Sequence, residues 1–242
     1  MPSLEPYRPG LSYTYALGLY PTLQALTLAP ERIRRVLLSS RLNEGAAYDK
    51  LTALCKSHSI RSEAADRLLR RLSGKDNCFA AAVISKQGEE AKASSLRHLV
   101  LHHPMDMGNA GTILRTALGF GFEDIAVITP AVDVFDPRVI RASMGALFSL
   151  RLGLFGSMND YLLKNPGRQL YLFMLDSAVP LSKIRPKKSE APVSLVFGNE
   201  GSGLPPEFAS LGTPVRIEQG EAIDSLNLAI AAGIGMYAFK RA

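Results

Sequence analysis

The segment Val193-Ser-Leu-Val-Phe-Gly-Asn-Glu-Gly-Ser-Gly-Leu-Pro205 joins a short apolar run to a loop with three glycines. The run Val193–Phe197 shows no alternation of polar and apolar residues, which is typical of a strand buried on both faces of a parallel sheet. Glycine at positions Gly198, Gly201 and Gly203 lets the backbone turn sharply and approach a ligand closely. Ligands of such sheets bind at loops beyond the carboxyl ends of the strands. This loop is therefore the first candidate site.

The rest of the chain repeats the alternation of strand, loop and helix. Further strands are predicted at residues 99–102, 125–129, 170–175 and 214–217, and helices at 112–120, 137–147 and 225–241. A polar stretch at 87–95 separates them from a smaller set, with strands at 35–39 and 79–85 and helices at 46–57 and 62–72. The pattern predicts an α/β fold of two domains, residues 1–90 and 97–242, the second with a parallel sheet.

Composition and charge narrow the class of protein. The 242 residues are 47% hydrophobic and 21% charged, values that exclude a wholly disordered chain. The net charge is +6, and residues 1–95 hold 14 Lys and Arg against 9 Asp and Glu, whereas residues 96–242 hold 14 against 13. A basic first third favours a polyanionic partner such as nucleic acid about as strongly as it favours simple solubility.

Other features predict what the protein lacks. Cys55 and Cys78 have no zinc-ligand spacing and indicate reduced thiols in a cytoplasmic protein. The longest apolar stretch, 226–239, is shorter than the about 20 residues that cross a bilayer. His102 and His103 would point to opposite faces at a strand end, so they make a poor metal site. We expect neither a membrane nor a metal partner.

Two further segments carry polar residues where a helix begins. In Asp106–Arg115, Asn109 lies on the predicted loop and Arg115 about one turn into the helix. The spacing of its glycines lacks the G-x-G-x-x-G of dinucleotide sites, and no GK[ST] follows, so a P-loop is excluded. In Ser225-Leu-Asn227, Ser225 is predicted to cap the last helix, which places Asn227 inside its first turn.

Taken in order, Asn109-x-Gly111-x-x-x-Arg115, Gly198-Asn-Glu200-Gly-x-Gly203-Leu and Ser225-Leu-Asn227 resemble the three motifs of the SpoU (TrmH-like) branch of the SPOUT RNA methyltransferases. The resemblance spans about residues 97–240. It implies a parallel-sheet domain with a deep trefoil knot, a homodimer, and S-adenosyl-L-methionine (AdoMet) as cofactor. The chain departs from the family at Ile217-Glu218-Gln219, where members often have Ile-Pro-Met, and at Ala229, where they often have Ser.

The resemblance also assigns residues. It implies cofactor contacts at Gly198, Ile217 and Leu226. It implies an active site of Asn109, Arg115, Glu200, Ser225 and Asn227. Because an arginine is essentially never deprotonated, we expect the Arg115 guanidinium, held by Asn109 or Glu200, to stabilise the developing alkoxide, with a base role for Arg115 left open.

The first domain is similar, more loosely, to the ribosomal-protein-L30e-like substrate domain that often precedes SpoU domains. Arg67, Arg70 and Arg71 lie at i, i+3 and i+4 on one predicted helix, so they share a face that is suited to contact phosphates, although a merely solvated face has the same pattern. The implied reaction is methyl transfer to a ribose 2′-OH of ribosomal or transfer RNA. The alternatives are a non-catalytic RNA-binding or ribosome-associated protein with the same fold, and a nucleotide-dependent oxidoreductase.

Overall fold

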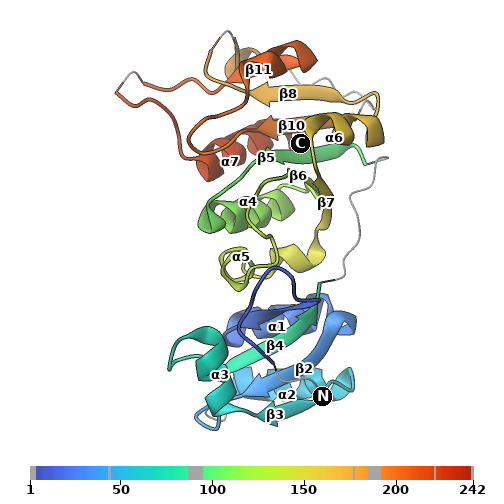
Figure 1. Cartoon of the computed structure of the whole chain (residues 1–242), viewed down its shortest axis with the longest axis vertical. Helices are drawn as coiled ribbons and strands as arrows, with labels where there is room; N and C mark the ends of the chain where they lie inside the picture. The colour runs from blue at the N-terminus through green and yellow to red at the C-terminus, as the bar shows by residue number, and fades with distance from the viewer. Residues whose placement is uncertain are drawn as a thin grey trace. The chain divides into compact units, whose positions relative to one another are not determined.

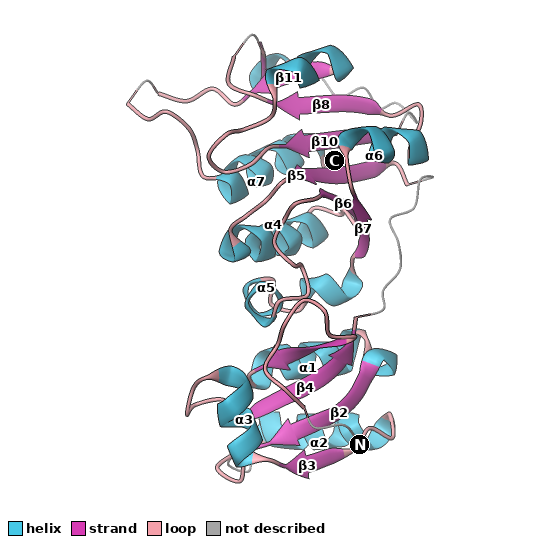
Figure 2. Cartoon of the chain, viewed as in Figure 1, coloured by secondary structure: helices cyan, strands magenta, loops and turns pink. Residues whose placement is uncertain are grey.

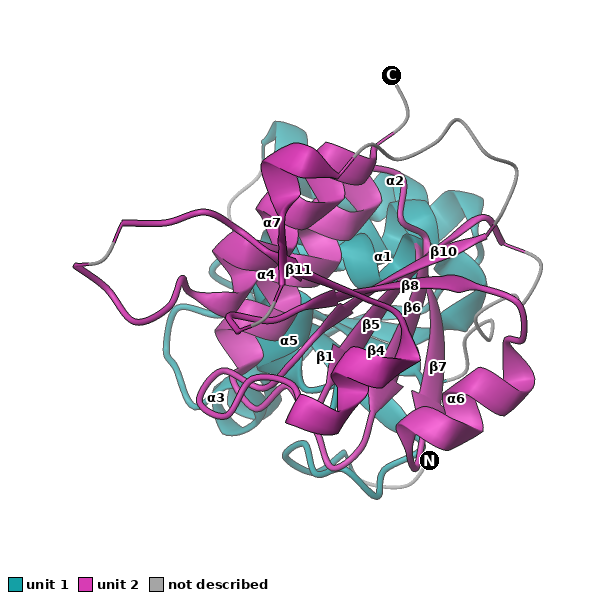
Figure 3. Cartoon of the chain, turned by 90° about the horizontal axis from the view of Figure 1, so that it is seen from above, with its two compact units in different colours: residues 1–87, 133–149 teal, residues 88–132, 150–242 magenta. Residues whose placement is uncertain are grey.

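The computed structural model describes residues 4–42, 45–86, 95–176, 178–184, 192–220 and 222–240. They fall into two compact units, Met1–Gln87 with Asp133–Ser149, and Gly88–Val132 with Leu150–Ala242 (Figure 3). The predicted boundary at 87–95 lies outside the described residues except for Ser95. Residues 133–149 belong to the first unit although they follow position 97 in the sequence. The roles assigned to domains 1–90 and 97–242 stay predictions.

The first unit is a four-stranded sheet in the order β1-β4-β2-β3 with helices packed on it (Figure 2). Its strands are β1 (Tyr13–Leu17), β2 (Ile33–Leu38), β3 (Ser62–Ala64) and β4 (Ala80–Ser85), and its helices are α1 (Leu19–Leu28), α2 (Ala46–Ser57), α3 (Asp66–Ser73) and α5 (Pro137–Ala142), with 3₁₀ turns at Pro30–Arg32 and Ala146–Ser149. The helix predicted at 62–72 is confirmed only from Asp66 onward, as α3, since Ser62–Ala64 instead pairs in parallel with β2.

Residues 133–149 are joined to the first unit by specific bonds. The Asp133 carboxylate accepts from the Tyr7 hydroxyl and from Lys86 Nζ. The Thr14 hydroxyl donates to the carbonyl of Phe135 at 2.5 Å. Since a buried polar group needs a partner to offset its loss of water, these bonds fix the segment in place.

The second unit is a seven-stranded sheet in the order β7-β6-β5-β10-β8-β11-β9, and every neighbouring pair is parallel, as predicted (Figure 1). Its strands are β5 (Arg97–His102), β6 (Asp124–Ile128), β7 (Arg151–Phe155), β8 (Gln169–Phe173), β9 (Val179–Pro180), β10 (Val193–Phe197) and β11 (Thr213–Arg216). The edge strands β7 and β9 were not predicted, because β7 contains a glycine and an arginine among its five residues and β9 spans only two residues.

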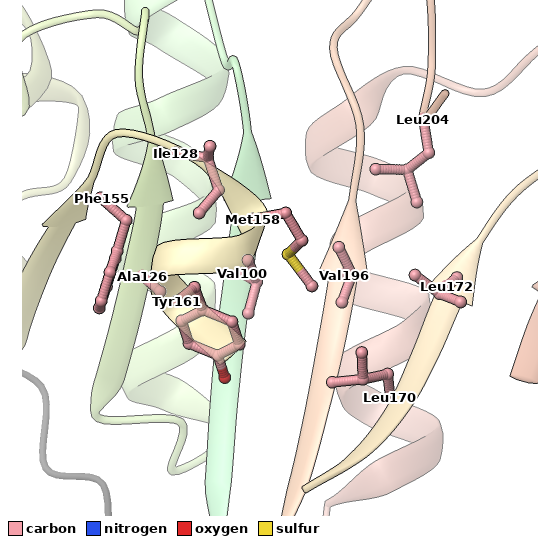
Figure 4. Close-up of a cluster of buried hydrophobic side chains, with 10 residues drawn as sticks. All are labelled: Val100, Ala126, Ile128, Phe155, Met158, Tyr161, Leu170, Leu172, Val196 and Leu204. Carbon is pink, nitrogen blue, oxygen red and sulfur yellow. The ribbon is translucent and has the colours of Figure 1, made fainter. Parts of the chain in front are cut away.

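Helices cover both faces of this sheet. They are α4 (Met107–Gly119), α6 (Met158–Lys164) and α7 (Leu228–Phe239), with 3₁₀ turns η3 (Leu181–Lys183) and η4 (Pro206–Leu211). Helices α4 and α7 pack together on one face, and α6 lies on the other (Figure 3). Beneath α6, Met158 and Tyr161 close a buried cluster over strand residues such as Val100, Val196 and Leu172 (Figure 4). None of the helices in the described ranges has the length and apolar character needed to cross a membrane.

Candidate functional site

A cavity of about 550 Å³ opens at the carboxyl ends of β8, β10 and β11, all in the second unit. Its walls come from four segments, and its lining includes residues 173–176 after β8, 197–204 after β10, Ile217 and Gln219 after β11, and 224–226 before α7. The volume lies within the range of sites for small molecules and cofactors. The position is the one predicted for a ligand of a parallel sheet.

The glycine loop after β10 is built by close backbone contact. A Cβ on Gly198 would lie 2.1 Å from the carbonyl carbon of Gly203, so only glycine fits there. Gly203 has a positive φ of 67°, and its backbone exchanges hydrogen bonds with that of Asn199. The Asn199 amide oxygen accepts from the backbone N–H groups of Gly201 and Ser202. The glycines therefore give the loop one compact shape rather than flexibility.

Glu200 ties this loop to the start of α4. Its carboxylate accepts from the backbone N–H of Met105 at 3.0 Å and of Asp106 at 3.1 Å. The side-chain amides of Asn109 and Asn199 each donate to it at 3.4 Å. A carboxylate at the N-terminal end of a helix is also favoured by the helix dipole. Glu200 therefore holds two loops together, and backbone and amide N–H groups take the place of the Arg115 guanidinium that it was expected to bind.

Asn109 links the first and third motifs. Its amide donates to Glu200, and its side-chain oxygen accepts from the Asn227 amide at 3.0 Å. The Asn227 side-chain oxygen in turn accepts from the N–H groups of Ala229 and Ile230, so Asn227 is the N-cap of α7. The prediction that Ser225 caps this helix is wrong, because Asn227 takes that role. The side chains Asn227, Asn109 and Glu200 form one hydrogen-bonded chain.

The structure brings most of the predicted site residues together. Five of them line the cavity: Gly198, Glu200, Ile217, Ser225 and Leu226. Asn109 and Asn227 lie next to it through their bonds to Glu200 and to each other. Their catalytic or cofactor-binding roles stay predictions.

Arg115 is the exception. Helix α4 begins at Met107 because the Asp106 carboxylate caps it, accepting from Asn109 N at 2.7 Å. Arg115 therefore lies in the third turn, not one turn in as predicted. Six residues of α-helix separate it from Asn109 by about 240°, so the two side chains leave different faces. Among the described residues Arg115 is exposed, makes no hydrogen bond or ion pair, and is absent from the cavity lining. The expected bond to Asn109 or Glu200 is not formed within this chain.

Sequence reasoning missed the charge of the cavity. Asp176 and Asp224 line it together with Glu200, and no Lys or Arg occurs among the described lining residues. Asp176 directly follows a predicted strand, and Asp224 directly precedes a predicted helix. Because binding residues are common in such loops, these positions could have identified both aspartates as candidate binding residues. The lining as a whole favours a cationic ligand.

The histidines before α4 also differ from expectation. His103 lies beyond the end of β5 with φ 54°, which breaks the alternation of a strand. Its ring stacks on that of His102 with centroids 3.8 Å apart, instead of pointing to the opposite face. His102 is buried against Phe208, and its Nδ1 has no partner among the described residues. Burial, and to a smaller extent His103, lowers the pKa of His102. Within the described part of the chain, no group of three or more His, Cys, Asp or Glu could hold a metal ion.

The second unit is a parallel sheet with an acidic cavity at the carboxyl ends of its strands, and a glycine loop forms part of the cavity wall. These features are typical of α/β domains that bind a small ligand. Comparison with known proteins identifies the family. Residues 97–237 match the model of the SpoU rRNA Methylase family. The chain therefore belongs to this family, and the resemblance carried by the three motifs is confirmed.

Named relatives and solved structures agree with the family. The chain is 29% identical over 198 residues to a 23S rRNA (adenosine(1067)-2′-O)-methyltransferase of Streptomyces laurentii, covering 77% of this chain and 72% of that protein. It is 36% identical over 146 residues to an uncharacterized tRNA/rRNA methyltransferase of Synechocystis, covering 59% of this chain but only 52% of that protein. The AdoMet-bound rRNA methyltransferase of Sinorhizobium meliloti superposes with a TM-score of 0.78 and 26% identity, covering 94% of this chain and 86% of that one.

Proposed function

We propose that this protein transfers a methyl group from AdoMet to a ribose 2′-OH of ribosomal or transfer RNA. The observation that carries the proposal is the cavity, whose charged described lining residues are all acidic and which adjoins the Asn227–Asn109–Glu200 chain. The named relatives support it, because several are RNA 2′-O-methyltransferases. A protein that only bound RNA would not need a cavity of this charge.

The residues of the cavity fit AdoMet. The cofactor supplies an activated methyl group on a positively charged sulfonium. Asp176 and Asp224 favour such a cation, and they would repel the diphosphate of a nicotinamide dinucleotide, which argues against an oxidoreductase. Gly198, Ile217 and Leu226 would hold the cofactor, since they line the same cavity. The glycine loop offers backbone groups without side chains in the way.

The chain's own residues prepare the acceptor. Ser225 is exposed in the cavity lining, where its hydroxyl can orient the ribose hydroxyl. Asn109, Asn227 and Glu200 hold the surrounding loops rigid, so that little reorganisation is needed when charge develops. The missing element is a cation for the developing alkoxide, because Arg115 of the same chain lies outside the cavity.

We therefore place Arg115 of a second copy at the site, in a homodimer. Helix α7, which packs beside α4, exposes Ile230, Ile234 and Tyr237, with 55%, 38% and 59% of their surfaces accessible. The spacing puts the three on one helix face, and an exposed apolar face of this kind is typical of a subunit interface. Arg115, on the exposed side of the neighbouring helix, would be carried by this interface toward the other copy's cavity.

Complementation tests the reaction and the dimer together. Arg115→Ala and Asn227→Ala variants are each assayed for transfer of tritiated methyl from AdoMet to total RNA of cells lacking the gene. We expect each variant alone to lose activity about 10²–10³-fold, as for removal of one preorganised donor. If Arg115 acts across a dimer, an equimolar re-associated mixture should recover about a quarter of wild-type activity, since half the dimers hold one complete site.

Controls separate the parts of this proposal. AdoMet binding to the Arg115→Ala variant, measured by calorimetry, should equal that of the wild type. A mixture as inactive as its components would show that Arg115 does not act in trans. A wild-type protein that binds NAD and not AdoMet would overturn the methyltransferase assignment.

The first unit is proposed to bind the RNA. Residues 1–87 and 133–149 hold 15 Lys and Arg against 9 Asp and Glu, whereas the remaining residues hold 13 against 13, so the whole net charge lies in this unit. Arg67 and Arg70 are exposed on α3. Arg71, predicted to join them, donates to the carbonyl of Leu4 and so also anchors the N-terminal segment.

Finer features of the fold belong to the same proposal. We infer an L30e-like first unit, a trefoil knot in the C-terminal part of the methyltransferase domain, and a cytoplasmic location. The support for the knot is the strand order, in which β10 lies between β5 and β8 and β11 returns to the far side of β8. The support for the location is the pair of free, buried cysteines, Cys55 and Cys78.

A further inference from the structure

The loop between β11 and α7 forms one wall of the cavity. It is the orange-red loop that projects from the sheet in Figure 1. Ile217, Gln219, Asp224, Ser225 and Leu226 all line the cavity, yet the described residues 217–220 and 222–227 contain no helix or strand. Because these residues lack the regular backbone hydrogen bonds of a helix or sheet, the conformation of this wall depends on hydrogen bonds made by side chains.

The start of the loop is attached through Glu218. Its carboxylate accepts from the hydroxyl and the backbone N–H of Ser182, the N–H at 3.3 Å from Oε1. These bonds hold the pKa of Glu218 below its usual value. Ser182 lies in η3, directly after β9, and β9 pairs with β11. The loop is thus tied to the edge of the sheet where it begins, as Asn227 ties it to α4 where it ends.

Gln219 connects the two halves of the loop between these attachments. Its side-chain Nε2 donates to the carbonyl of Ile223 at 3.3 Å and to that of Asp224 at 3.1 Å. One amide nitrogen carries two hydrogens, so both bonds form at once. The bridge fixes the backbone immediately before Ser225 and Leu226, and it sets where the Asp224 carboxylate enters the cavity.

We propose that Gln219 is a positioning residue for the AdoMet site, which acts by holding the segment 222–224 in the shape that the bound cofactor requires. This inference rests on the proposed function. A chain that lacks the bridge has to order the segment when the cofactor binds, and that ordering weakens affinity without changing the bound state. Gln219 should therefore determine the affinity for AdoMet and leave the methyl-transfer step nearly unchanged.

Gln219→Met tests the bridge, because methionine keeps the length of the side chain and removes both donors. We expect the Kd for AdoMet, measured by calorimetry, to rise about tenfold, as for the loss of two hydrogen bonds. The KM for AdoMet should rise in parallel, while kcat at saturating AdoMet and the KM for RNA stay within about twofold of wild type. A merely structural role would lower the melting temperature and affect both substrates.

Gln169→Met is the matched control. Gln169 is exposed at the start of β8, and its side chain forms no hydrogen bond with the described residues. It should leave both constants at wild-type values. If Gln219→Met binds AdoMet as tightly as wild type while wild type binds and methylates normally, the inference is wrong and the proposed function stands. If wild type itself does not bind AdoMet, both are overturned.

Discussion

Both carboxylate oxygens of Glu200 accept hydrogen bonds from backbone N–H groups at the start of α4. Among the described residues, the Asp176 and Asp224 carboxylates of the same cavity have no hydrogen-bond donor. A carboxylate without a local partner acts on a ligand through its full charge, and a sulfonium ligand differs from its thioether product by one positive charge. The two aspartates are therefore expected to distinguish the cofactor from the product.

Asp224→Asn measures this effect with little change in side-chain shape. We expect the variant to bind AdoMet about three- to tenfold more weakly, and to bind S-adenosylhomocysteine within about twofold of wild type, because only AdoMet loses a charge partner. Calorimetry with each compound gives the ratio. Glu207→Gln is the control, because the Glu207 side chain is exposed on η4 and is not among the residues that line the cavity. Equal weakening for both compounds would contradict charge selection.

His102 gives a pH dependence of known sign. Burial lowers its pKa from the ordinary value of about 6.5. Above that value the imidazole is neutral in both folded and unfolded chains, so its contribution to stability is constant. As the pH falls below it, the unfolded chain takes up a proton before the folded one, and the free energy of unfolding decreases.

We therefore expect the melting temperature to fall between pH 7.5 and pH 5.5, and to fall less for His102→Phe. Phenylalanine keeps a ring against His103 and Phe208 and removes the titration. Thermal melts of both proteins over this range provide the measurement. Parallel curves for the two would show that other groups cause the loss of stability.

At the scale of the element, a glycine allows α7 to pack closely against the sheet. A Cβ on Gly235 would lie 2.7 Å from Cζ of Phe173 and 2.8 Å from Cζ of Phe197, whose rings stack at 4.2 Å beneath the helix. Gly235→Ala should lower the free energy of unfolding by about 1–3 kcal/mol through overpacking. Gly233→Ala is the matched control, because its Cβ would meet only the Thr116 methyl at 3.6 Å, and alanine favours the helix by up to about 1 kcal/mol. Urea denaturation that ranked the two variants in the opposite order would refute this account.

The sequence predicts an element well when the pattern that indicates it lies within the element itself. Buried parallel strands such as β10 are continuous apolar runs, and they were predicted within a residue or two. The predicted starts of α4 and α7 were misplaced. The N-caps are Asp106 and Asn227, and the sequence does not show which of several neighbouring polar residues makes the capping hydrogen bond. β3 was missed since its pairing with β2 overrides the helical propensity of a short edge segment.

The same contrast holds for the site. The resemblance of the three motifs predicted that Asn109, Glu200 and Asn227 belong to one site, and hydrogen bonds join these side chains in the structure. Their shared role in catalysis stays a prediction. The bridge that Gln219 makes across its loop could not be predicted, because the loop has no periodicity. The place of Arg115 in the third turn of α4 could not be predicted either, because it depends on where α4 begins.

At the scale of the whole molecule, charge and chemistry are divided between the two units. The cavity lies in the unit with no net charge, and the excess of Lys and Arg lies in the other. An acidic cavity suits a cationic cofactor but repels a polyanion, which supports the proposal that the basic unit binds the RNA.

This division predicts how binding responds to salt. Each phosphate that the protein no longer neutralises reduces the slope of log K against log salt by about one unit. Arg67→Ala with Arg70→Ala should therefore flatten the slope for a labelled stem-loop RNA by about two. AdoMet affinity should stay at the wild-type value, because the cavity is in the other unit. Lys164→Ala, in the neutral unit, is the control and should leave the slope unchanged.

Arg71 separates charge from structure in the same experiment. Its guanidinium donates to the carbonyl of Leu4, whose side chain packs into the buried cluster of the first unit with Tyr15 and Leu69. Arg71→Ala should therefore lower the melting temperature, whereas Arg67→Ala and Arg70→Ala should not. A salt slope unaffected by all three substitutions would remove α3 from the RNA-binding surface and leave the other basic side chains of the first unit, such as Arg41 and Lys56, as the contacts to test.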